Sequence, residues 1–260
     1  MTKSLLAGAV FLAAAAPAMA ADLPVKAPAP VVAAPVSFYN WSGFYVGAHA
    51  GYGWGESRWA FQHDSFWNNT RGERINTRPD GWLGGGQIGF NYQAGRFLLG
   101  VEGTLSAADI SKTVPSPISP AVVFGADRET TKVKSLYTVA GRVGAVWDQF
   151  LFYGKGGWAG ARVELSARTD FGGGAAWKSA KDRSGYIVGA GAEYMFTPNI
   201  ILGVEYNYID LGTATYSARN TGPGAANFLP GNTDVRDKTQ IHTIAARVSY
   251  KFNWTPIGSL

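Results

Sequence analysis

The sequence predicts an all-β fold, an eight-stranded antiparallel β-barrel that spans a membrane, and three observations support this prediction. Apolar and polar side chains alternate along eight segments, as they do in strands whose two faces meet different surroundings. The connections between these segments are alternately short and long. Aromatic residues make up 13% of the chain and gather near the segment ends. An even strand number, short turns at one end, long loops at the other and two aromatic belts are typical of transmembrane barrels.

The composition narrows the class of protein further. Only 16% of the residues are charged, below the roughly 25% that is usual for soluble domains. No run of eighteen apolar residues follows the N-terminus, which excludes a helical membrane protein. The chain has no cysteine, so no disulfide framework holds it together. A formal net charge of +5 is too small to indicate a nucleic-acid partner.

The N-terminus carries the pattern of an export signal. Lys3 precedes the apolar run "LLAGAVFLAAAA", and "AMA" provides a small-residue cleavage site. We therefore expect a secretory signal peptide over residues 1–20. The Pro- and Ala-rich stretch that follows is typical of an extended linker, here periplasmic, over residues 21–40. The barrel is expected over 41–252, followed by a C-terminal tail over 253–260.

The first four predicted strands each have an apolar face and a small or polar face. "FYVGAHAGYGW" sets Phe, Val, Ala, Tyr and Trp against Tyr, Gly and His. "WLGGGQIGFNYQ" sets Trp, Ile, Phe and Tyr against Gln, Gly and Asn. "FLLGVEGTL" sets Phe, Leu and Val against Leu, Gly, Glu and Thr, and "SLYTVAGRVGAVW" sets Tyr, Val and Ala against Thr, Ala, Arg and Gly. These strands are expected at 44–54, 82–93, 97–105 and 135–147.

The second four strands follow the same alternation, with one irregular member. In "FLFYGKGGWAGARVEL", Phe152 and Trp158 share one face while Tyr153 and Lys155 share the other, and the pattern allows a bulge near Gly156–Gly157. "YIVGAGAEYMF", "IILGVEYNYID" and "IHTIAARVSYKF" alternate cleanly. The four strands are expected at 150–165, 186–196, 200–210 and 241–252.

The connections and the aromatic residues together orient the predicted barrel. Short turns are expected on the periplasmic side at 94–95, 148–149 and 197–199. Long extracellular loops are expected at about 55–80, 108–131, 166–183 and 213–239. Aromatic residues of the apolar face would form one belt near the loops (Tyr52, Trp54, Trp82) and another near the turns (Phe97, Trp147, Phe196, Tyr250, Phe252). The alternative is a soluble β-barrel with these aromatics in its core and its polar face in water.

Six charged residues are predicted to lie at one depth inside the barrel. Each sits on the inner face, three to six positions from the short-turn end of its strand. An eight-stranded barrel is just wide enough for side chains to fill, and an unpaired charge inside a membrane is unfavourable. We therefore predict an ion-pair network, with glycines leaving room for long side chains, rather than six separate charges in a wet lumen. The predicted members are Glu102, Arg142, Lys155, Glu193, Glu205 and Arg247.

Other motifs do not support a catalytic or cofactor site. A G-x-G-x-x-G pattern at Gly84, Gly86 and Gly89 lies inside one predicted strand and is not followed by a helix, so it does not indicate nucleotide binding. The three histidines lie on separate segments without the spacing of metal ligands: His49, His63 and His242. No catalytic triad or paired-carboxylate cleft can be assembled. We expect no metal, no cofactor and no enzymatic activity.

Several stretches resemble a known family. The export signal, the "ADLP" start with its Pro-rich linker, "WSGFYVGAHAGYGWG", the two "GVE" strands and "RVSYKF" resemble the small outer-membrane immunogenic proteins, or porin-like surface antigens, of Gram-negative bacteria. The resemblance spans nearly the whole chain. It implies an eight-stranded barrel in the cell outer membrane with antigenic surface loops. Some members are described as haemin-binding or weakly porin-like, but no haem motif can be matched to residues of this chain.

The sequence leads to two expectations for function. The first is a structural outer-membrane barrel that presents surface loops and supports the envelope, and the alternative is a narrow channel or a barrel that binds a small ligand such as haemin. The expected partners are outer-membrane lipid, lipopolysaccharide and the barrel-assembly machinery. Barrels of this kind commonly end on the aromatic of the last strand, whereas "NWTPIGSL" follows Phe252. Tyr250 and Phe252 would therefore serve as an internal assembly signal.

Overall fold

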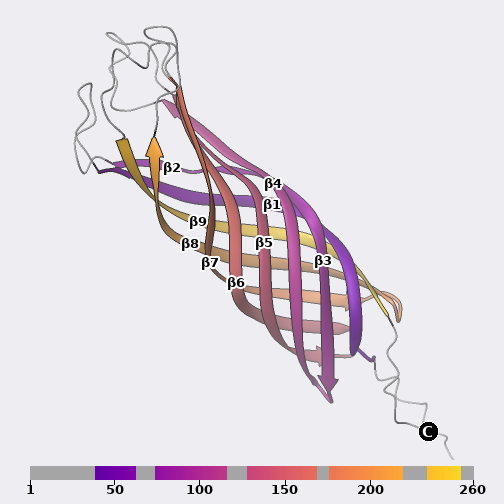
Figure 1. Ribbon diagram of the computed structural model, residues 1–260. Helices are drawn as coiled ribbons and strands as arrows, with labels where there is room; N and C mark the ends of the chain where they lie inside the picture. The colour runs from indigo at the N-terminus through magenta and orange to yellow at the C-terminus, as the bar shows by residue number, and fades with distance from the viewer. Residues whose placement is uncertain (1–38, 63–73, 116–127, 169–175, 219–232, 253–260) are drawn as a thin grey trace, which may run out of the picture. The chain divides into compact units, whose positions relative to one another are not determined.

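The computed structural model describes residues 39–62, 74–115, 128–168, 176–218 and 233–252. Residues 1–38 and 253–260, which include the predicted signal peptide, most of the linker and the tail, lie outside this part of the chain. In the described part no helix has the length and apolar character needed to cross a membrane. The strands, shown in Figure 1, are β1 (Gly43–Phe61), β2 (Arg74–Thr77), β3 (Asp80–Ala94), β4 (Phe97–Pro115), β5 (Arg128–Trp147), β6 (Phe150–Arg168), β7 (Ala176–Met195), β8 (Ile200–Ala218) and β9 (Thr233–Lys251).

The sheet closes on itself. From β3 to β9 each strand pairs antiparallel with the next, and β1 pairs with both β3 and β9. The closing pair is long, running from Tyr45 opposite Lys251 to Phe61 opposite Val235. A closed ring leaves no free sheet edge, which is the arrangement that a membrane requires of strands. The predicted antiparallel barrel is confirmed.

β2 and β3 are two parts of one barrel strand. Trp54 pairs with Asp80 on β3, and Ser57 pairs with Thr77 on β2, so the register along β1 is unbroken. The interruption falls at Pro79, which has no N–H for the ladder, although its carbonyl still accepts a hydrogen bond from the Gly55 amide at 2.9 Å. The barrel therefore has eight strand positions, as predicted.

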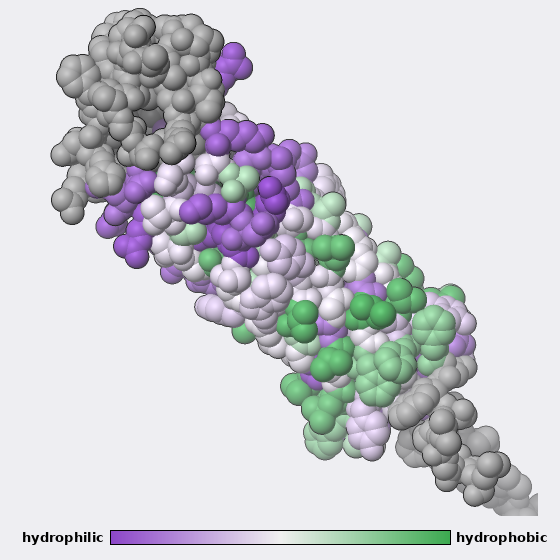
Figure 2. Space-filling model, viewed as in Figure 1, coloured by the Kyte–Doolittle hydropathy of each residue, from purple (hydrophilic) through white to green (hydrophobic). Residues whose placement is uncertain are grey.

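The predicted apolar face points outward. Trp82 is 72% exposed on the loop side and Trp147 is 75% exposed on the turn side. The space-filling view shows hydrophobic side chains over the end of the barrel that bears the short turns, and hydrophilic side chains toward the other end (Figure 2). Large apolar side chains exposed around a whole barrel indicate a lipid-facing surface. The alternative of a soluble barrel with an aromatic core is wrong.

The strands are longer than the sequence predicted. All except β2 have 15 to 20 residues, whereas a tilted membrane span needs about 9–11. Much of the predicted loop sequence is therefore strand. In these strand extensions the polarity of the faces is inverted: Thr113 and Lys132 lie toward the outside, and Ile110 and Val133 are fully buried inside. The extensions thus have the faces of a soluble barrel, and continue the wall beyond the apolar band.

Bulges lie where the polarity changes. The ladder shifts in β4 between Ala107 and Ile110, in β5 between Val133 and Ser135, and in β8 between Asp210 and Thr213. In β8 the extra residue is accommodated with Gly212 at φ 64°, a left-handed conformation that glycine adopts readily. No shift occurs at Gly156–Gly157, where pairing with β5 and β7 is continuous. The bulge considered there is wrong.

The interior of the barrel is filled in layers. A turn-side apolar layer lies next to the short turns, and a loop-side apolar layer lies in the extensions, with polar and charged side chains between them. The turn-side layer consists of Trp41, Leu98, Val146, Leu151, Tyr153, Met195 and Ile201. The loop-side layer includes Trp59, Ile110, Val133, Val163, Leu165, Ile209, Tyr216, Val235 and Ile241.

Candidate functional site

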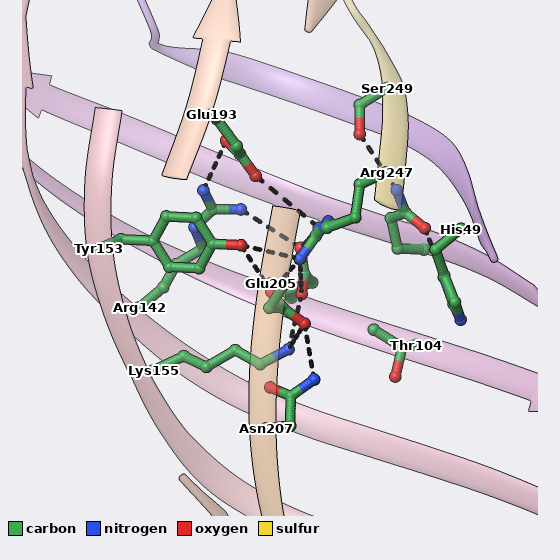
Figure 3. A network of polar contacts seen from close by, with 12 residues as sticks. His49, Thr104, Arg142, Tyr153, Lys155, Glu193, Glu205, Asn207, Arg247 and Ser249 are labelled. Carbon is green, nitrogen blue, oxygen red and sulfur yellow. Dashed lines mark hydrogen bonds and ion pairs between the residues drawn. The ribbon is translucent and has the colours of Figure 1, made fainter. Parts of the chain in front are cut away.

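The candidate site is the lumen charge network, formed by the six charged residues between the two apolar layers (Figure 3). One residue comes from each of six consecutive strands, β4 to β9. Their exposed fractions lie between 1% and 7%. The structure brings all six sequence-predicted residues together: Glu102, Arg142, Lys155, Glu193, Glu205 and Arg247.

Glu102 receives the most contacts. Arg142 Nη1 lies 3.2 Å from its Oε2, and Lys155 Nζ lies 3.3 Å from its Oε1. The Arg247 guanidinium forms a further, close ion pair with the same carboxylate. The hydroxyl of Tyr45 donates to Oε2 at 2.7 Å. One carboxylate thus contacts all three cations of the network.

The other two carboxylates complete the charge balance. Glu205 lies 2.6 Å from Lys155 Nζ and pairs closely with Arg247. Glu193 lies 2.8 Å from Arg142 Nη2 and 3.9 Å from Arg247 Nη2. Every cation therefore bridges at least two carboxylates, with three charges of each sign. Charges that are paired and hydrogen-bonded in this way can be buried, because each desolvated group has several partners.

Two tyrosines belong to the network although the sequence analysis did not include them. The hydroxyl of Tyr153 donates to Glu205 at 2.6 Å and accepts from Arg247 Nη1 at 3.0 Å. The Arg142 guanidinium lies over its ring, 3.9 Å from the centroid. Tyr45 donates to Glu102 from the opposite wall. Strand alternation could have indicated them, because both tyrosines occupy inward-facing positions of their strands.

Small residues make room for these rings. A side chain at Gly89 would collide with the Tyr45 hydroxyl and ring, and one at Gly191 would collide with the ring of Tyr153. These two glycines therefore allow the walls to approach the aromatic rings, as expected for close backbone contact. Gly89 is the last glycine of the G-x-G-x-x-G pattern, and its role is steric, whereas a Cβ at Gly84 or Gly86 would meet no atom closer than 3.5 Å.

A small polar cavity lies on the loop side of the network. Its volume is about 40 Å³, and its polar lining includes His49, Thr104, Thr138 and Asn207. The His49 ring is fixed by Gln87 at 2.7 Å and by Ser106 at 2.8 Å. The cavity has room for roughly three water molecules. It lies between the network and the loop-side apolar layer.

A second buried ion pair lies among the extensions. Arg183 pairs closely with Asp237, and its Nη2 donates to the Gly212 carbonyl at 2.6 Å. Asp237 also accepts from Ser57 at 2.6 Å. This pair is not predictable from the alternation pattern, because both charges fall in segments whose sequence predicts loops.

The proposed assembly signal and the two described histidines do not join the lumen charge network. Tyr250 and Phe252 are 49% and 51% exposed on the outer face, with ring centroids 5.1 Å apart, and their role as an assembly signal remains a prediction. His49 is in the lumen and His242 lies on the outer face, while His63 falls outside the described residues. Among the described residues, no group of three or more His, Cys, Asp or Glu side chains is placed to hold a metal ion.

Comparison with known proteins gives a consistent picture. The family model for the outer membrane protein beta-barrel domain matches residues 5–252. The 31 kDa outer-membrane immunogenic protein of Brucella melitensis is 31% identical over 256 residues, covering 96% of this chain and 100% of the relative. The 25 kDa outer-membrane immunogenic protein of Brucella abortus is 30% identical over 258 residues, covering 96% and 98%. This chain therefore belongs to the outer membrane protein beta-barrel domain family and is located in the outer membrane.

Proposed function

We propose that this protein is a structural outer-membrane barrel with a closed lumen, which presents surface loops and supports the integrity of the envelope. The observation that carries the proposal is the filled interior. Two apolar layers and the lumen charge network follow one another along the barrel axis, and the cavity beside the network has a volume of only about 40 Å³. A barrel filled in this way serves as a rigid membrane anchor rather than as an aqueous path.

The turn-side mouth is closed by the segment that precedes β1. Trp41 is fully buried in the turn-side apolar layer. Its backbone N–H donates to Gln93 Oε1 at 2.8 Å. The neighbouring Tyr39 hydroxyl accepts a hydrogen bond from Gln149 Nε2 at 2.5 Å. These contacts hold an indole ring across the periplasmic end of the lumen.

The proposed orientation can be tested by labelling, because the chain has no cysteine. Thr113 lies on the outer face of a strand extension and Asp148 lies in a short turn, and both are exposed. On intact cells, a membrane-impermeant maleimide should label Thr113→Cys and should not label Asp148→Cys. Permeabilised cells should show labelling of both variants. Labelling of Asp148→Cys alone on intact cells would show that the short turns face the cell exterior, and would refute the proposed presentation of the long loops.

Support of the envelope requires a separate measurement in cells. A strain that lacks the protein should take up an outer-membrane-impermeant dye faster, and expression of the wild-type chain should restore the slow rate. Unchanged dye uptake after deletion would refute the integrity role while leaving the surface role intact. The alternative function is a narrow channel or a haemin-binding barrel. Measuring the ion conductance of the wild-type protein tests the channel.

A further inference from the structure

An outward-facing groove lies at the boundary between the apolar band and the charged extensions. It has a volume of about 620 Å³ and is bordered by β1, the β2–β3 junction, β4 and β9. Its lining combines aromatic, cationic and anionic groups, including Trp54, Glu56, Arg78, Asp80, Lys112 and His242. In a protein of the outer membrane, a boundary of this kind marks the level of the lipid headgroups.

Aromatic rings form a rigid apolar base for the groove. Trp54 stacks on His242 with a centroid distance of 5.8 Å and an interplanar angle of 9°. The Tyr206 hydroxyl holds His242 Nδ1 at 2.7 Å. Beside them, Tyr52 and Trp82 make an edge contact at 5.3 Å. Amphipathic rings of this kind settle at the interface between headgroups and acyl chains.

Two cations in the groove each have only one long ion pair, with a carboxylate that already has a closer partner. Glu56 already pairs with Arg58 at 2.8 Å, and Arg78 Nε approaches Glu56 only to 3.8 Å. Asp80 already accepts from the Tyr52 hydroxyl at 2.5 Å, and Lys112 Nζ lies 3.6 Å from it. The Arg78 side chain is 83% exposed and that of Lys112 is 49% exposed. Their donors are therefore available to an external anion.

We propose that this groove binds a phosphorylated glycolipid of the outer leaflet, with Arg78 and Lys112 as the phosphate ligands. Guanidinium and ammonium groups form strong, charge-assisted hydrogen bonds with phosphate oxygens. Along β3 and β4 toward the turn side lies exposed apolar surface, with Trp82 at 72%, Ile88 at 63% and Leu105 at 65% exposure. One lipid molecule can thus place its phosphate between the two cations and its acyl chains along this surface.

The test measures lipid affinity of the folded full chain in zwitterionic detergent. The probes are bisphosphorylated lipid A and the same lipid with both phosphates removed, each titrated by native mass spectrometry. We expect the wild-type protein to prefer the phosphorylated lipid. The double variant Arg78→Gln/Lys112→Gln should bind the phosphorylated lipid about tenfold or more weakly, because two charge-assisted contacts are lost. Its affinity for the dephosphorylated lipid should not change.

A matched control separates a defined site from general charge attraction. The variant Arg128→Gln/Arg162→Gln removes the same two positive charges from exposed positions on β5 and β6, and should bind like the wild type. Three results would each overturn the proposal. They are equal weakening of lipid binding in both double variants, unaltered binding by Arg78→Gln/Lys112→Gln, and no preference of the wild type for the phosphorylated lipid. A heat-modifiable band checks folding, and the charge-conserving pair Arg78→Lys/Lys112→Arg should keep the phosphate preference. The groove is on the outer surface, so the result does not depend on whether the lumen conducts.

Discussion

Glu102 is the residue on which the contacts of the lumen charge network converge. It contacts three cations and the Tyr45 hydroxyl, and it is 2% exposed. Removal of one member of a buried ion pair leaves the others desolvated and without compensation. The energetic weight of the network should therefore be greatest at this position.

The first prediction is that Glu102→Ala strongly destabilises the barrel. The variant leaves three cations with two carboxylates, and the expected loss in the free energy of unfolding is about 3–5 kcal/mol. Denaturant-induced unfolding in detergent micelles measures this loss. Glu56→Ala is the matched control, because Glu56 pairs with Arg58 on the exposed outer face, and surface pairs contribute little. Equal stability of the two variants would contradict the energetic role of the network.

For individual residues, the sequence predicted the positions of the lumen charges but not the hydrogen bonds of their polar neighbours. Strand position and parity place six charged residues at one depth, since each lies on an inward face near a short turn. The same parity placed Tyr153 inward, but a phenol among aromatics gives no indication that its hydroxyl will bond a carboxylate. Arg183 and Asp237 were out of reach, because hydropathy in their segments is typical of loops.

At the scale of strands, the apolar band and the extensions follow opposite rules. In the band, outward residues are apolar, as at Val143, which is 60% exposed. In the extensions, outward residues are polar, as at Thr113, whose hydroxyl lies 2.9 Å from that of Thr130. The physical reason is the solvent, which changes from lipid to water along one strand.

The second prediction tests this boundary with one side chain in two places. Val143→Arg puts a charge against lipid near the middle of the band and should cost about 2–4 kcal/mol in folding free energy. Thr113→Arg puts the same charge on an outward face of the extension and should fold as well as the wild type. The yield of heat-modifiable protein after refolding into lipid vesicles measures both. Efficient refolding of Val143→Arg would show that this face is not in lipid.

The extensions explain why strand existence was predictable and strand length was not. An alternation of apolar and polar residues marks a strand only while the solvent on each face stays the same. Past the bulges the apolar side moves inward, and in β8 the shift at Gly212 also changes parity, so that both Leu211 and Tyr216 are buried. Both the inversion of polarity and the shift of parity interrupt the two-residue alternation from which the strands are predicted.

For the molecule as a whole, closure of the sheet and filling of the lumen act together. Eight strand positions give a narrow interior, which the two apolar layers and the lumen charge network occupy. The charge layer is held between apolar layers, so water has little access to its ion pairs. The barrel class, the eight strand positions and the outer-membrane location were all predictable, because strand alternation and connection lengths are repeated along the whole chain. The two apolar layers were not, because they depend on which inward residues meet across the barrel.

The closed lumen is the central claim, and ion conductance of the wild-type protein in planar lipid bilayers tests it most directly. The full chain, refolded and shown to be heat-modifiable, is inserted at low protein density under an applied voltage. We predict a current indistinguishable from that of the bare bilayer, because Trp41 covers the turn-side mouth and two further layers fill the path. Steady, uniform single-channel steps from the unmutated protein would contradict the closed lumen and favour the narrow-channel alternative.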